Sequence, residues 1–124
     1  MQRRARVRAH DLRFALDDTG AGFAGLATLA LLEPEFVKVD VSLVRACDAT
    51  PFKRAIIESL LALGQTSRFE VIAEGIETFA EFTTLRRLGV CLGQGYLLGR
   101  PEELPVTRLV GRSPWWSAAE ARPA

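Results

Sequence analysis

Seven polar side chains with the chemistry for metal or phosphate binding lie in four short clusters along the 124 residues. Carboxylates dominate, joined by one lysine and one glutamine: Asp17, Asp18, Lys38, Asp40, Glu74, Glu77 and Gln94. Five carboxylates brought to one place repel one another strongly unless a cation holds them, and oxygen-rich clusters suit Mg²⁺ or Mn²⁺. A lysine among them can neutralise a phosphate or a developing oxyanion. The residue types therefore indicate a metal-assisted phosphate site.

Each cluster also has a plain structural interpretation. Asp17 and Asp18 before glycines are compatible with a turn, and Lys38 with the surface of an edge strand. The glutamates suit a solvated loop, and Gln94 suits a turn. Four such clusters in succession favour the functional interpretation.

The clusters follow short apolar segments that alternate with helical patterns. Strands are predicted at residues 13–16, 36–40, 71–73 and near 90–92, and helices at 24–32, 50–63 and 78–88. This order, with buried apolar strands, favours an α/β fold in which helices cover a parallel sheet. Parallel strands bring their carboxyl ends to one edge, where such folds build their sites. We therefore expect the polar clusters to meet at that edge.

The helix ends and buried faces follow from local patterns. Thr50 before Pro51 is typical of an N-cap, and Thr78 with Glu81 matches a capping box. Glycines at 64 and 89 are expected to end their helices. The predicted buried positions are Leu26, Leu29, Leu32, Phe52, Ile56, Leu60, Leu63, Phe79, Phe82, Leu85 and Leu88.

Composition narrows the class of protein. The chain has 16 basic and 15 acidic residues, and 48% of its residues are hydrophobic, which suits one globular domain and argues against disorder. No apolar run reaches the length of a membrane span, and the near-zero charge gives no general reason to expect nucleic-acid binding. The basic stretch 1–13 is interpreted as a solvated helix face rather than a nucleic-acid arm. Cys47 and Cys91 are predicted to be small, reduced core residues of a cytoplasmic protein.

The order and spacing of four motifs resemble the EAL-domain family over about residues 3–104. The motifs are Asp17 to Phe23, Lys38-Val39-Asp40, Glu74 to Thr78 and Gln94-Gly95-Tyr96. EAL domains are (β/α)₈ barrels that hydrolyse cyclic di-GMP to linear pGpG with Mg²⁺ or Mn²⁺. The resemblance therefore implies a TIM-like barrel fold, this substrate and one of these cofactors.

The resemblance also implies a role for each matching position. Asp17 and Asp18 correspond to aspartates that bind the metal pair, and Lys38 to the lysine that contacts the attacking water and the scissile phosphate. Glu74 corresponds to the glutamate beside the metal and water. The positions that imply supporting or substrate-binding roles are Asp40, Glu77 and Gln94.

The match is incomplete in two respects. The 124 residues contain no Glu-Ala-Leu motif, whose glutamate binds metal in the family, nor the asparagine and further glutamate that complete that shell. A (β/α)₈ barrel typically needs about 250 residues, so we expect the last four βα units in residues 1–104 and a C-terminal helix or tail at 105–124. Thr19 and Ala21 also replace a phenylalanine and a threonine of the family loop that positions metal and dimer contacts.

Two functions remain open on this basis. The first is the C-terminal part of a cyclic di-GMP phosphodiesterase, inactive or weak alone. The second is a non-catalytic EAL-like module that binds cyclic di-GMP or a protein partner. Half a barrel exposes strand edges, so we expect pairing with an N-terminal half or formation of a homodimer.

Overall fold

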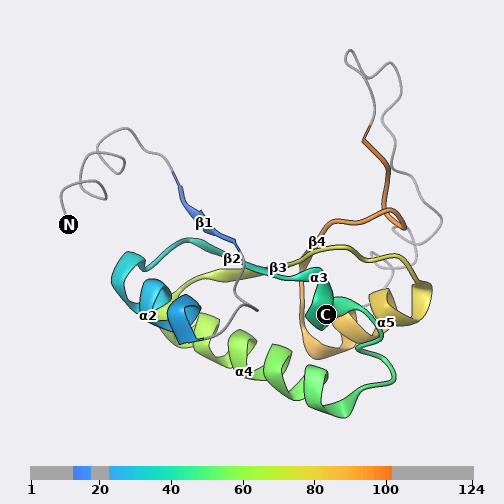
Figure 1. The fold of residues 1–124 in the computed structure, drawn as a ribbon, viewed down its shortest axis with the longest axis horizontal. Coiled ribbons are helices and arrows are strands. Elements are labelled where there is room, and N and C mark those ends of the chain that lie inside the picture. Colours follow the sequence, from blue (N-terminus) through green and yellow to red (C-terminus); the bar gives the residue numbers. More distant parts are fainter. Residues whose placement is uncertain (1–12, 18–22, 102–124) are drawn as a thin grey trace, which may run out of the picture.

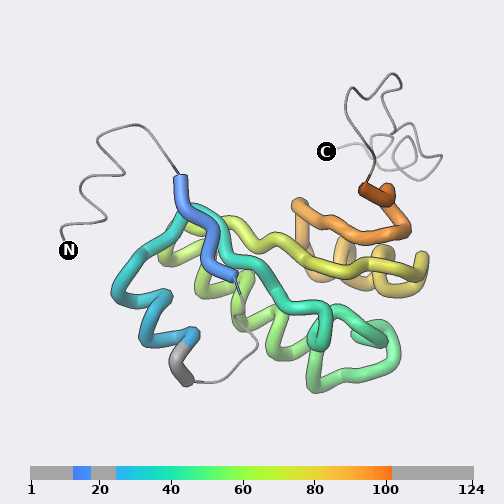
Figure 2. Tube along the Cα trace, turned by 45° about the horizontal axis from the view of Figure 1, so that its top comes forward, coloured from blue at the N-terminus to red at the C-terminus, as the bar shows by residue number. Residues whose placement is uncertain are grey.

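The computed structural model describes residues 13–17 and 23–101, in which four parallel strands lie side by side in the order β1-β2-β3-β4 (Figures 1 and 2). The α/β fold with parallel βα units is confirmed. The elements in chain order are β1 (Ala15–Leu16), α2 (Phe23–Leu32), β2 (Phe36–Val39), α3 (Val41–Val44), α4 (Pro51–Ser67), β3 (Glu70–Ala73), α5 (Phe79–Leu88) and β4 (Leu92–Gly93).

The sheet is covered by helices on one face, where α2, α4 and α5 lie (Figure 1). Side chains alternate across the sheet, so Val37, Val39, Val71 and Ala73 point to the helices and are buried. They pack in one core with helical residues such as Ile57. Lys38 and its register partner Ile72 are only partly buried and lie on the other face.

The strand β1 corrects one prediction. Residues 13–16 are predicted to form a buried strand, but Ala15 is exposed and Leu16 is half-buried. The reason is position: β1 is at the end of the described strand order and pairs there with β2 alone. It is anchored by the backbone N–H of Phe14, which donates to Glu35 Oε2 at 2.7 Å.

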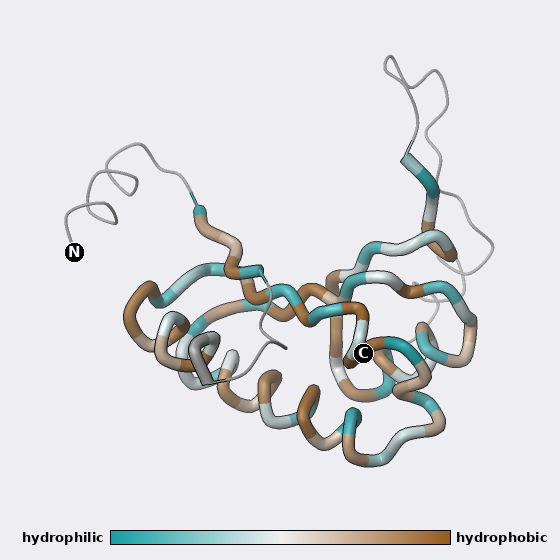
Figure 3. The backbone as a smooth tube through the Cα atoms, viewed as in Figure 1, coloured by the Kyte–Doolittle hydropathy of each residue, from teal (hydrophilic) through white to brown (hydrophobic). Residues whose placement is uncertain are grey.

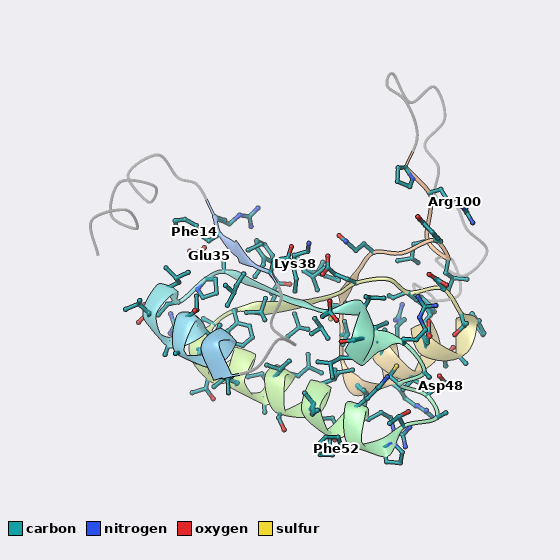
Figure 4. All side chains as sticks on the ribbon, in the orientation of Figure 1. Phe14, Glu35, Lys38, Asp48, Phe52 and Arg100 are labelled. Carbon is teal, nitrogen blue, oxygen red and sulfur yellow. The ribbon has the colours of Figure 1, made fainter. Side chains whose placement is uncertain are left out.

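The predicted face of α4 is wrong by part of a turn. Phe52 is 75% exposed and points away from the sheet (Figure 4), and Leu63 is also exposed. The buried residues are Ile57, Leu60 and Gly64, while Ile56 is half-buried. Hydrophobic and polar residues alternate along this helix (Figure 3), and its paired apolar residues allow more than one inward stripe.

Gly64 does not end α4, which continues to Ser67 and ends at the left-handed Arg68. A Cβ at Gly64 would lie 2.7 Å from the carbonyl oxygen of Phe69. This glycine therefore lets the chain that follows α4 pack closely against the helix. Gly89, by contrast, ends α5 with a φ of 105° as predicted.

Other predicted core positions are exposed as well. On α2, Leu29 is buried, whereas Leu26 and Leu32 are exposed; on α5, Leu85 is buried and Phe79 is exposed. Cys47 is a buried free thiol as predicted, but Cys91 is exposed.

The predictions for Asp18, the basic stretch 1–12 and the segment 105–124 lie outside the described residues. Within residues 13–17 and 23–101, no helix has the length and apolar character required to cross a membrane.

Candidate active site at the carboxyl ends of the strands

Lys38 lies between two carboxylates from the neighbouring strands. Its Nζ is 2.5 Å from Glu74 Oε1 and 3.2 Å from Asp17 Oδ2. The register of β1 against β2 explains why Asp17 and Lys38 are close. Leu16 pairs with Val37, so the next residues on each strand, Asp17 and Lys38, lie level with each other. Lys38 lies on the face of the sheet opposite the helices (Figure 4). The predicted convergence of these three residues is confirmed.

The two carboxylates fix the charge of Lys38. The hydrogen bond to Glu74 raises the pKa of Lys38 above its ordinary value, against the opposing effect of partial burial, and Asp17 adds to the rise. Lys38 is therefore a fixed ammonium at neutral pH. Its side chain is 22% exposed, so an anion can still reach it from solvent.

Gln94 brings the fourth strand into the same cluster. Its Nε2 donates a hydrogen bond to Glu74 Oε1 at 2.9 Å. The backbone N–H of Gln94 donates to the carbonyl of Ala73, and its carbonyl accepts from Ile76 N. Glu74 is thus the residue on which the ends of β2, β3 and β4 converge.

Asp40 lies one residue beyond β2, but it caps a helix instead of joining the cluster. Its Oδ2 accepts a hydrogen bond of 2.8 Å from Ser42 N at the start of α3. The hydrogen bonds from Ser42 lower the pKa of Asp40 below its ordinary value. Asp40 therefore starts the helix that follows β2.

Glu77 pairs with Arg45, a residue that the sequence did not single out. The two guanidinium nitrogens of Arg45 lie 2.5 and 2.8 Å from the carboxylate oxygens of Glu77, a bidentate geometry. This hydrogen bonding lowers the pKa of Glu77 and raises that of Arg45. Arg45 has no motif around it, so no sequence signal indicated this partner.

The carboxylates that the structure describes have the right chemistry for Mg²⁺ or Mn²⁺ but do not by themselves form a site for it. No group of three His, Cys, Asp or Glu side chains in the described ranges is arranged to hold a metal ion. Asp17 and Glu74 instead share the ammonium of Lys38. Further carboxylates from outside the described residues are needed to complete a metal shell.

Four parallel strands, the first three each followed by a helix, carry a lysine and carboxylates at their carboxyl edge and define an α/β domain with a candidate site at the strand ends. The EAL domain family matches residues 2–101, and the chain belongs to this family. EAL domains are TIM-barrel folds, so the four strands represent part of such a barrel.

Individual relatives agree with this placement. The probable cyclic di-GMP phosphodiesterase PdeD of Escherichia coli K12 is 35% identical over 94 residues, which are 76% of this chain and 18% of PdeD. A standalone EAL protein from Vibrio cholerae O395, solved with cyclic di-GMP bound, has a TM-score of 0.76 and 34% identity, covering 80% of this chain and 42% of that one. The manganese and cyclic di-GMP complex of Klebsiella pneumoniae BlrP1 has a TM-score of 0.72 and 38% identity, covering 77% and 24%.

The chain therefore spans less than half the length of these relatives. The comparisons place the chain in the EAL family and assign it the fold of part of a TIM barrel.

Proposed function

We propose that this chain supplies the second half of a barrel that hydrolyses cyclic di-GMP to linear pGpG. The observation that carries the proposal is the ammonium of Lys38, held 2.5 Å from Glu74 and 3.2 Å from Asp17 at the carboxyl edge of the sheet. A fixed positive charge at this edge suits a phosphodiester, whose transition state gathers negative charge on the phosphoryl oxygens.

Each residue of the cluster has a task in this proposal. Lys38 binds a phosphoryl oxygen and the attacking water, and Glu74 fixes the direction of its Nζ. Gln94 holds Glu74 in place through the 2.9 Å hydrogen bond. Asp17 and Asp18 would contribute to binding Mg²⁺ or Mn²⁺ once the other half supplies the remaining ligands. A bound divalent cation would supply a water of lowered pKa and charge neutralisation.

Because the 124 residues contain no Glu-Ala-Leu motif, whose glutamate binds metal in the family, we infer that the chain alone is inactive or very weak. The partner in the proposal is an N-terminal half-barrel that carries the Glu-Ala-Leu motif. Cys47 and Cys91 are free thiols, which agrees with reaction in the cytoplasm.

The test is hydrolysis of cyclic di-GMP with Mg²⁺ or Mn²⁺, followed by separation of pGpG. The chain is assayed alone and after co-expression with the N-terminal half of a related EAL domain. We expect activity only in the co-expressed assembly, and its loss in Lys38→Gln. The matched control is Arg87→Gln, which removes a positive charge from the exposed surface of α5, away from the cluster.

Two results would contradict the proposal. Hydrolysis by the isolated chain that Asp17→Ala abolishes would refute its dependence on a second half. A folded co-expressed assembly that loses no activity in Lys38→Gln would refute the role of Lys38.

A second candidate is a non-catalytic module that binds cyclic di-GMP or a protein partner. Thr19 and Ala21 favour it, because they replace a phenylalanine and a threonine in the loop after Asp18. Lys38, Glu74 and Gln94 would still offer one cation and polar groups to a phosphate. Calorimetric titration with cyclic di-GMP tests it, and no heat at high micromolar ligand would remove cyclic di-GMP binding by the isolated chain.

A further inference from the structure

Glu81 is a buried carboxylate to which neither proposed function gives a role. It lies on α5 and is 2% exposed. Its Oε2 accepts hydrogen bonds of 3.1 Å from the backbone N–H groups of Glu77 and Thr78. Its Oε1 accepts one of 3.0 Å from the backbone N–H of Ala46. The bond from Thr78 belongs to the capping box, but the bond from Ala46 comes from a loop 35 residues away.

One carboxylate therefore joins two segments that follow neighbouring strands. The first is the segment 40–46 after β2, and the second is the segment 74–78 after β3. Both follow strands that carry the candidate site, since Lys38 lies on β2 and Glu74 directly follows β3. Charge-assisted hydrogen bonds to backbone N–H groups are among the stronger ones in proteins, so this junction is stiff.

The conformation of Ala46 shows that the junction constrains the backbone. Ala46 has a φ of 55°, in the left-handed region that residues other than glycine rarely adopt. Such conformations persist only where the surroundings hold them. The hydrogen bond from Ala46 N to Glu81 supplies that hold, and the next residue, Cys47, is fully buried.

Two further contacts connect the same loops. Arg45 forms its bidentate pair with Glu77. Gly75 has a φ of 70°, and a Cβ there would collide with the side chain of Val41, so α3 lies directly against the peptide beside Glu74. A movement of segment 40–46 would therefore displace Gly75, which directly follows Glu74.

We propose that Glu81 is a positioning residue that sets Glu74 against Lys38 by clamping segments 40–46 and 74–78 together. Its effect on ligand binding rests on the proposed function, whereas its effect on the position of Glu74 does not. The side-chain amide of Gln94 reports that position, because it donates to Glu74 Oε1.

The experiment is ¹H–¹⁵N NMR of the 124-residue chain and of four variants. In Glu81→Gln the amide keeps only one acceptor oxygen, so it cannot hold both loops. Glu81→Asp keeps the negative charge but has a side chain shorter by one methylene group. It is the variant to measure if Glu81→Gln does not fold. Glu58→Gln makes the same chemical change on the exposed face of α4. Thr78→Ala removes the other half of the capping box and leaves the link to Ala46 in place.

We expect the Glu81 variants to shift the Gln94 side-chain signals together with the Ala46 amide. Thr78→Ala should lower the unfolding midpoint without moving the Gln94 signals, and Glu58→Gln should change neither. If the Glu81 variants lower the midpoint while the Gln94 signals stay in place, Glu81 is only a helix cap and the proposal is overturned.

Cyclic di-GMP affinity is measured in parallel by calorimetry. Outer-shell partners of metal ligands typically contribute about 10- to 100-fold, and by analogy we expect a loss of about 10-fold in the Glu81 variants. A wild-type chain that binds no cyclic di-GMP would contradict ligand binding by the isolated chain, and the NMR result would still decide the role of Glu81.

Discussion

Single residues in the candidate site are held by their backbone neighbours as much as by their own contacts. Glu74 follows β3, and its backbone N–H donates to the carbonyl of Val39. Gln94 and Leu97 bond to the backbone of Ile76, which ties the last turn to the segment of Glu74. The geometry around Lys38 therefore depends on close backbone approaches that only some residues allow.

Gly95 is the first such position to test. It has a φ of 153°, and a Cβ there would collide with the backbone nitrogen and oxygen of Ile76. We expect Gly95→Ala to destabilise the chain by about 1–3 kcal/mol, because a backbone shift is needed to fit the methyl group. Urea unfolding measures this, with Gly99→Ala as the control, since a Cβ at Gly99 meets no atom within 4 Å. Equal stability of the two variants would contradict the prediction.

The ionisation of Glu81 gives a pH dependence with a definite sign. Burial raises the pKa of Glu81, but hydrogen bonds from Ala46, Glu77 and Thr78 outweigh it and leave the pKa below the ordinary 4.5. The unfolded chain therefore binds the proton first, and the ionised group stabilises the fold above its ordinary pKa. This contribution is lost as the pH falls through the lower folded-state pKa.

Comparison with Glu81→Gln isolates this contribution. At neutral pH we expect the wild type to be more stable by about 2 kcal/mol, from hydrogen bonds to a charged group. The difference should shrink once the pH falls below about 4.5, as measured by urea unfolding across the acid range. The nearby Arg45 and Glu77 are present in both proteins, so their titration largely cancels. A constant difference down to about pH 3 would show that Glu81 does not act through its charge.

The two helix N-caps predicted from sequence differ in the structure. The capping box of α5 is complete in the structure, because Thr78 accepts from Glu81 N and Glu81 accepts from Thr78 N. At α4, Thr50 occupies the N-cap, but its side chain makes no capping hydrogen bond. The same residue type at two predicted caps therefore has different roles.

This contrast gives a matched pair of variants. We expect Thr78→Ala to cost about 1 kcal/mol of stability, the usual value for a lost N-cap hydrogen bond. Thr50→Ala should stay within about 0.5 kcal/mol of wild type, because no such bond is lost. Chemical unfolding of both variants in one buffer provides the measurement. A larger cost at Thr50 than at Thr78 would reverse the assignment of the two caps.

The order of the four strands and of helices α2, α4 and α5 was predictable from sequence, and so was the meeting of Asp17, Lys38, Glu74 and Gln94. They depend on apolar strands followed by polar groups, which a parallel sheet must bring to one edge. Asp40 and Glu77 were predicted as supporting residues, but their partners Ser42 and Arg45 were not. Helix α3, which was not predicted from sequence, places both partners.

The buried faces of the helices were less predictable, for a packing reason. Helix α4 contains the adjacent pairs Ile56-Ile57 and Leu60-Leu61, so neighbouring stripes are almost equally apolar. The stripe that is buried includes Gly64, where the lack of a side chain lets Phe69 approach closely. Such contacts are tertiary, and local periodicity does not encode them.

At the scale of the whole molecule, the sheet formed by the described strands is open. In the part of the chain that the structure describes, β1 and β4 each pair with one strand, and α2, α4 and α5 cover a single face (Figures 1 and 2). On the other face, Phe36 is half-buried and Arg13 lies over its ring at 5.2 Å. Open edges and an uncovered face favour association with another sheet of the same strand direction.

We therefore predict that the 124-residue chain self-associates, and that an N-terminal half-barrel displaces this association. Sedimentation velocity over a concentration series measures the first effect, and a mixture with the N-terminal half of an EAL domain measures the second. Ala15→Lys places a charge on the exposed edge strand β1 and should weaken both forms of association. Ala27→Lys makes the same change on the exposed surface of α2 and should weaken neither. A monomer that unfolds cooperatively and ignores the N-terminal half would show that four βα units are sufficient alone.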